Sequence, residues 1–113
     1  MWLTAYDTTR TWPPTEARFG SRVQVGKRKD FAWAELIPPI QRPDGAEWST
    51  VLLGARHQGF SVWDPPSRWP IHVYVCTTSP DHWGGSSIPV DEVTIESWGL
   101  LHETRARALV DEF

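Results

Sequence analysis

The sequence predicts a mainly β (α+β) fold: a small antiparallel, SH3-like or partly open β-barrel with one C-terminal α-helix. Short runs of alternating or β-branched residues follow one another along the chain, and clusters of Pro, Gly and Asp separate them. The hydrophobic period changes from two to about 3.6 only after residue 103. Consecutive strands with a helix last favour an antiparallel architecture over a parallel α/β sheet. At 113 residues, we expect one domain spanning 1–113.

The first 20 residues are expected to form an extended N-terminal arm (1–20). Residues 2–6 form a short candidate strand, and the adjacent prolines at 13 and 14 exclude a regular helix in the segment that follows. We expect Trp2 or Trp12 to dock on the domain.

A β-hairpin is predicted next, because residues 21–25 and 31–37 alternate and a short Gly-containing polar loop joins them. Both faces of the second strand are apolar, with Phe31, Trp33 and Ile37 on one face and Ala32, Ala34 and Leu36 on the other. This pattern indicates a strand that is covered on each side. Glu35 is the exception near its end.

The central strand is predicted at residues 69–76, the densest β-branched and aromatic run of the chain. Ile71, Val73 and Val75 would point to one face of it. Residues 38–46 are a loop by composition. Further strands are expected at 48–56, 60–63 and 93–98.

Two helical segments are expected in the C-terminal part. Residues 89–93 are predicted to hold a short helical turn, and a C-terminal helix is predicted at 103–113 with Thr104 as its N-cap. The apolar residues of this helix are spaced to form one face, made of Ala106, Leu109, Val110 and Phe113.

Charge and composition exclude several classes of protein. The chain has no signal-peptide pattern and no apolar run long enough for a membrane helix, so we expect a soluble, cytoplasmic protein. The net charge is −3, whereas nucleic-acid-binding domains usually carry a basic excess. Residues 10–42 hold seven Lys or Arg against three acids, and residues 91–113 hold six acids against two arginines.

The residues that could carry catalysis or bind metal are scattered. His72 and Cys76 would lie about 13 Å apart along one strand, so they cannot pair, and a structural role for Cys76 is favoured. The four histidines are isolated, and a metal site built from Asp81, His82 and Asp91 is the less favoured interpretation of that loop. We therefore expect no catalytic residues, no metal and no cofactor, and favour a protein that is not an enzyme.

The basic cluster Lys27, Arg28 and Lys29 lies at the tip of the predicted hairpin. A solvated hairpin end is the favoured interpretation, because the domain is acidic overall. The alternative is that the tip contacts nucleic-acid phosphates while nearby aromatic residues stack on bases.

Eight tryptophans are more than a core of this size can comfortably enclose, so exposed indoles are expected. The best candidate is Trp83, which lies with Asp81 and His82 in the turn-rich segment 77–87. Trp63 and Trp69 are expected near a strand end beside rigid prolines at 65, 66 and 70. Two interpretations stay open for these indoles: a partner-binding surface, or lids folded onto an undersized core.

The function expected from these observations is a non-enzymatic macromolecular interaction protein, an adaptor or inhibitor. It would bind another protein through its Trp-bearing loops and an acidic C-terminal surface, and that partner would be basic, for example a nucleic-acid-processing enzyme. The alternative is a nucleic-acid-binding or nuclease-type small β-barrel that uses the basic 27–29 tip. A third is a barrel that binds a small ligand between tryptophans.

Overall fold

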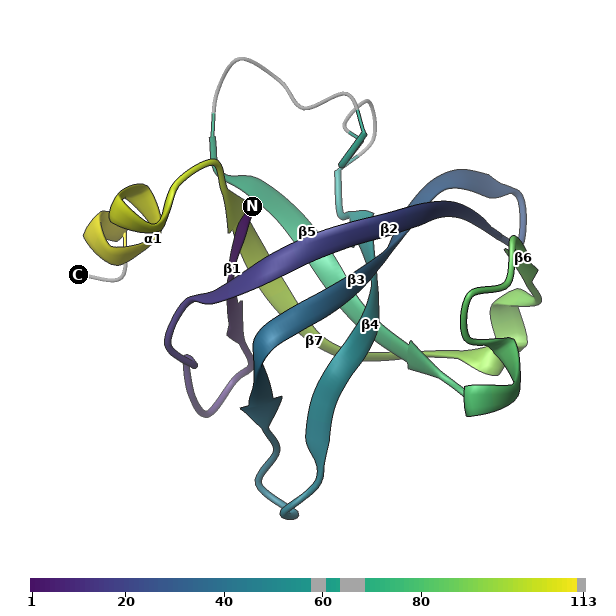
Figure 1. Ribbon diagram of the computed structural model, residues 1–113, viewed down its shortest axis with the longest axis horizontal. Coiled ribbons are helices and arrows are strands. Elements are labelled where there is room, and N and C mark those ends of the chain that lie inside the picture. The colour runs from purple at the N-terminus through teal and green to yellow at the C-terminus, as the bar shows by residue number, and fades with distance from the viewer. Residues whose placement is uncertain (58–60, 64–68, 112–113) are drawn as a thin grey trace.

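Strand pairing closes six strands of this chain into a ring. In a computed structural model that describes residues 1–57, 61–63 and 69–111, the sheet order is β1-β7-β5-β4-β3-β2-β6, and β1 also pairs with β2 (Figure 1). The strands are β1 (Trp2–Tyr6), β2 (Thr15–Val25), β3 (Arg28–Gln41), β4 (Glu47–Ala55), β5 (Ile71–Thr78), β6 (Ser87–Ile88) and β7 (Val93–His102). All pairs within the ring are antiparallel, and the short β6 pairs parallel with β2.

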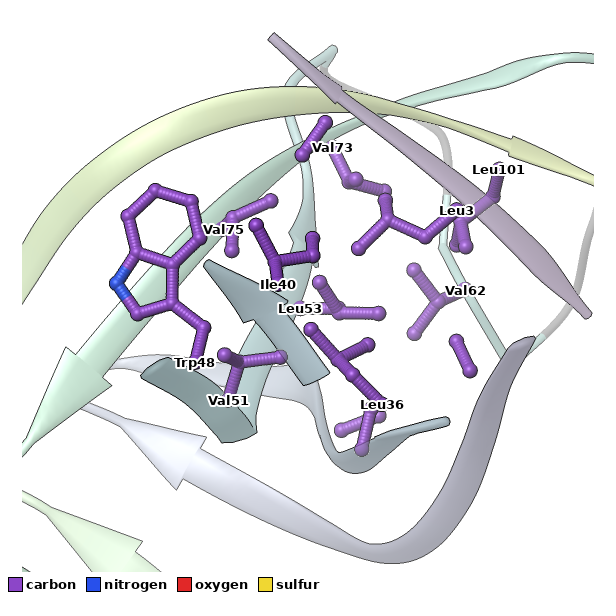
Figure 2. Packing of buried hydrophobic residues seen from close by; sticks show 14 of the residues in the cluster. Leu3, Leu36, Ile40, Trp48, Val51, Leu53, Val62, Val73, Val75 and Leu101 are labelled. Atoms are coloured by element: carbon purple, nitrogen blue, oxygen red, sulfur yellow. The ribbon is translucent and has the colours of Figure 1, made fainter. Parts of the chain in front are cut away.

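Alternate residues of the six strands fill the inside of the ring. Side chains from β1, β3, β4, β5 and β7 meet there with Val62 (Figure 2). Ile71, Val73 and Val75 of β5 belong to this interior cluster, as the alternation of the central strand predicts. The strand predicted at 69–76 is confirmed as β5, which begins two residues later, at Ile71, and lies between β4 and β7 in the ring.

A second apolar cluster lies on the outside of the sheet. It contains Val23, Val25, Phe31, Trp33, Leu52, Cys76 and Ile88. Phe31 and Trp33 belong to this outer cluster, whereas Ala32, Ala34 and Leu36 belong to the interior cluster. The prediction that this strand is covered on both faces is therefore confirmed for residues 31–36, with Glu35 exposed. Ile37, predicted to share the face of Phe31 and Trp33, is half-buried and belongs to neither cluster.

Two loop and strand boundaries differ from the sequence-based prediction. β3 runs to Gln41, past Pro38 and Pro39, with a pairing irregularity between Glu35 and Ile40. Composition predicted a loop there, but prolines are tolerated where a ladder is interrupted. The strand predicted at 60–63 is not formed by Ser61–Trp63, and Phe60 lies outside the described residues.

The N-terminal segment is not an arm lying on the domain. β1 pairs with β7 along its whole length and with the start of β2, so it completes the ring. Trp12 is buried, as a docked indole would be, and its Nε1 donates a hydrogen bond to the Gln41 carbonyl at 2.9 Å. The pairing of Trp2 with His102 joins opposite ends of the sequence, which a local pattern cannot predict.

The C-terminal helix is shorter than predicted. α1 spans Arg105–Asp111, and the Thr104 hydroxyl accepts a hydrogen bond from the Arg107 amide at 3.3 Å, as an N-cap does. Ala108 is buried while Ala106 is exposed, so the prediction that Ala106 faces the core is wrong. The side chain of Val110 and the whole of Phe113 lie outside the described residues. No helix in the described part of the chain is long and apolar enough to cross a membrane.

Candidate interaction surface at the Trp83 turn

The connection between β5 and β7 forms a rigid turn, residues 79–92, which we call the Trp83 turn. It contains two 3-10 helices, η1 (Pro80–His82) and η2 (Val90–Glu92), the second of which confirms the predicted helical turn. The amides of His82, Trp83 and Gly85 donate in succession to the carbonyls of Ser79, Pro80 and His82 at 2.9–3.1 Å. Gly84 adopts a positive φ of 78°, a conformation that favours glycine.

The Trp83 turn is fixed to the sheet behind it. The Nε1 of Trp33 donates a hydrogen bond to the Gly85 carbonyl at 2.8 Å, and Ile88 is buried in the outer cluster. Within the turn, His82 Nε2 lies 2.5 Å from a carboxylate oxygen of Glu92. The turn therefore has a defined conformation before any partner arrives.

Trp83 is exposed, as the lack of periodic neighbours predicted. All eight tryptophans lie in the described part of the chain, and among them only Trp83 is exposed, at 53%. Val90 in the same turn is 66% exposed. A large indole presented by a fixed backbone is typical of a protein contact site, because little conformational entropy is lost on binding.

Acidic side chains and a groove adjoin this indole. Asp81, Asp91 and Glu92 are all exposed within the turn. A shallow groove of about 330 Å³ lies alongside, and its lining includes Gly84, the residue after Trp83, together with Glu35 of β3. The turn therefore combines an exposed ring with a negative rim.

The structure places Trp63 and Trp69 against the domain. Trp63 Nε1 donates a hydrogen bond to the Phe31 carbonyl at 3.1 Å, and its ring contacts Phe19 edge-on at 5.8 Å between centroids. Trp63 and Trp69 are both half-buried and pack on the interior cluster, next to the buried Val62. Unlike Trp83, neither of the two indoles is exposed, and the prolines at 65 and 66 lie outside the described ranges.

The basic cluster 27–29 does lie at a hairpin tip. Gly26 turns the chain between β2 and β3 with φ at 59°, and the Lys27 and Lys29 side chains are exposed. Arg28 is used differently, since its Nη2 lies 2.7 Å from Asp30 Oδ2 and donates to the Ala55 carbonyl at 3.0 Å. All three cations are thus exposed, and Arg28 in addition connects the tip to β4.

The described part of the chain contains no metal-ligand cluster, and its one thiol is unreactive. No set of three His, Cys, Asp or Glu side chains there is close enough to hold a metal ion. Burial raises the pKa of the Cys76 thiol to about 12, so the thiolate needed for nucleophilic attack does not form near neutral pH. The loop residues Asp81 and Asp91 are exposed, and His82 pairs with Glu92.

Sequence reasoning missed a group that only strand pairing brings together. Tyr6, Trp98 and Tyr74 lie side by side on β1, β7 and β5, and Arg56 extends over two of their rings. We call these four residues the Arg56 strip. The alternation of each strand indicates that its aromatic residue faces outward, but nothing local in the sequence shows that the three strands are neighbours.

Comparison of the chain with protein-family models, with curated proteins and with solved structures finds no match.

Proposed function

We propose that this chain is a non-enzymatic interaction protein, an adaptor or inhibitor, that binds a basic protein partner through the Trp83 turn. The observation that carries this proposal is the 53% exposure of Trp83 on a turn that Trp33 holds to the sheet. Burying an exposed indole on association stabilises a complex, and hot spots are enriched in tryptophan.

The basic character of the partner follows from the rim of the turn. Asp81, Asp91 and Glu92 are exposed in the same turn as the indole, and Glu92 also pairs with His82. Lys or Arg side chains of a partner would pair with the carboxylates and lie on the face of the ring. Figure 1 shows α1 and β6 at opposite sides of the molecule. The acids that would act with Trp83 are therefore those of the turn itself rather than those of the C-terminal helix.

We further propose that the six-stranded ring is a small β-barrel of the SH3-like or partly open kind, serving as a rigid scaffold for this turn. The interior cluster and the outer cluster hold β3 on both faces, and β3 supplies the Trp33 anchor. Loops carried by a rigid scaffold are a common location for binding residues.

The proposal is tested by affinity capture from a nuclease-treated extract of the native host, with the wild-type chain and two variants as baits. Trp83→Ala should lose a protein that the wild-type chain retains. Ile95→Ala is the matched control, because Ile95 is an exposed apolar residue of similar exposure (56%) on β7, outside the turn. Equal capture by all three baits would show that the Trp83 turn is not the contact surface.

A further inference from the structure

A second surface, formed by the Arg56 strip, has chemistry that the proposed function does not use. Tyr6 of β1 pairs with Trp98 of β7, and Trp98 pairs with Tyr74 of β5. Since neighbouring strands are about 4.8 Å apart, the three residues form a row about 10 Å long across the sheet. The rings of Tyr6 and Trp98 have their centroids 6.2 Å apart, and all three residues are half-buried.

Arg56 follows the end of β4 and lies over this row. Its guanidinium carbon is 5.2 Å from the centroid of Trp98 and 5.8 Å from that of Tyr74. Its Nη1 donates a hydrogen bond to the Tyr6 hydroxyl at 3.0 Å. These contacts hold a planar cation in a fixed position on the outside of the sheet.

No carboxylate pairs with Arg56 among the residues that the structure describes, whereas Arg18, Arg28 and Arg42 each pair with a carboxylate. The hydrogen bond to Tyr6 uses one of the five guanidinium N–H donors. A fixed cation that has no acidic partner among the described residues is suited to bind an anionic group from outside the chain.

Two histidines and the basic 27–29 tip lie next to the Arg56 strip. His72, two residues from Tyr74 on the same strand, is exposed, and its ring contacts that of His57 at 5.2 Å between centroids. On the other side, Arg28 donates to the carbonyl of Ala55, the residue before Arg56. The exposed lysines at positions 27 and 29 therefore lie at the same end of the sheet as Arg56.

We propose that the Arg56 strip, with the 27–29 tip beside it, is a binding surface for single-stranded nucleic acid. Bases stack on aromatic rings and on guanidinium planes, while Arg and Lys donate to phosphate oxygens. The rings of Tyr6 and Trp98 are tilted by 41° to each other, so each of them, like the guanidinium, would receive a base separately. An acidic peptide would use the cations but leave the aromatic rings unused, and the rings therefore favour a nucleic acid as the occupant. No residue of the strip belongs to the Trp83 turn, so the two proposals can fail separately.

The test measures fluorescence anisotropy of a labelled single-stranded oligothymidylate of about twelve nucleotides, a length within known site sizes for barrel-type binders. We expect Arg56→Gln to weaken binding by at least about tenfold, because the substitution removes a group that both stacks on a base and binds phosphate. Arg22→Gln is the matched control: it removes the same charge from an arginine that also lies over an indole, 5.1 Å from the Trp63 centroid. The affinity of Arg22→Gln for the oligonucleotide should stay within about twofold of that of the wild type, since Arg22 is outside the strip.

Three further measurements make the result specific. Arg56→Lys keeps the charge but removes the planar group, so it should also weaken binding. This variant replaces Arg56→Gln in the test if Arg56→Gln proves unstable on thermal unfolding. Replacing Lys27 and Lys29 by Gln should make the slope of log affinity against log salt concentration shallower by about 0.7 for each phosphate that a lysine no longer neutralises. Oligoglutamate of equal charge and inorganic phosphate should compete poorly with the oligonucleotide.

Three outcomes would overturn the proposal. The wild-type chain could show no binding to the oligonucleotide, or Arg22→Gln could weaken binding as much as Arg56→Gln, which would indicate a non-specific effect of charge. Competition by oligoglutamate at the same concentration as the oligonucleotide would assign the strip to acidic protein segments instead.

Discussion

The indole nitrogen of Trp33 donates a hydrogen bond to the carbonyl oxygen of Gly85, 52 residues further along the chain, at 2.8 Å. This contact ties the Trp83 turn to β3, a strand that is covered on both faces. The position of the exposed indole is therefore set by the core of the domain.

Trp33→Phe tests this coupling. The substitution keeps an aromatic ring but removes the donor, so a partly buried carbonyl has no partner, which should cost about 1–3 kcal/mol of stability. Hydrogen exchange should also become faster across residues 79–92. Trp12→Phe is the matched control, because Trp12 is buried to a similar degree and donates to the Gln41 carbonyl at 2.9 Å. Trp12→Phe should lower stability without changing hydrogen exchange in the Trp83 turn. Equally faster exchange of the turn in both variants would contradict the coupling.

Gly54→Ala should destabilise the sheet. A Cβ at this position would lie 2.5 Å from the Phe31 ring, which is 5% exposed and packed in the outer cluster. Forcing the ring to move should cost about 1–3 kcal/mol in the free energy of unfolding, measured with denaturant. Gly20→Ala is the control, since its nearest atom would be 3.6 Å away, an ordinary contact. Equal stability of the two variants would mean that Phe31 does not pack on Gly54.

The stability of the protein should depend on the protonation of His72. Partial desolvation of the largely exposed imidazole first, and then the charges of His57 and Arg56, lower the pKa of His72 below its usual 6.5. As the pH falls, His72 is therefore protonated near pH 6.5 in the unfolded chain but only at a lower pH in the folded chain. The free energy of unfolding consequently decreases as the pH falls from about 6.5 through the lower folded pKa. His72→Gln should remove this part of the pH dependence of unfolding, and NMR titration of the imidazole should show a midpoint below 6.5. A midpoint above that value would contradict the arrangement of the three groups.

Cys76 should be unreactive in the folded protein. Its thiol is buried in the outer cluster, and that burial raises its pKa to about 12. Iodoacetamide near pH 8 should therefore modify Cys76 only slowly without denaturant and rapidly with it, because the thiolate is the reactive form. Fast modification of the native protein would show that the outer cluster around Cys76 opens readily.

Local patterns in the sequence predicted those features that depend on neighbouring residues. The two apolar faces around Phe31 and Ala32, the strand predicted at 69–76 and observed at Ile71–Thr78, and the exposure of Trp83 all follow from alternation or from its absence. The ring itself was harder to foresee, since it depends on β1 pairing with β7 across nearly the whole chain. For the same reason, Arg56 could not be connected with Tyr6 and Trp98 in advance.

Trp83→Ala, measured for stability and for partner binding in the same preparation, tests the central proposal most directly. Because Trp83 is 53% exposed, its removal should change the free energy of unfolding by no more than about 0.5 kcal/mol. The same substitution should weaken the complex with the captured partner by about 2 kcal/mol or more, roughly a thirtyfold rise in Kd. Lower stability with an unaltered Kd would contradict the proposal and make Trp83 a cover for the core.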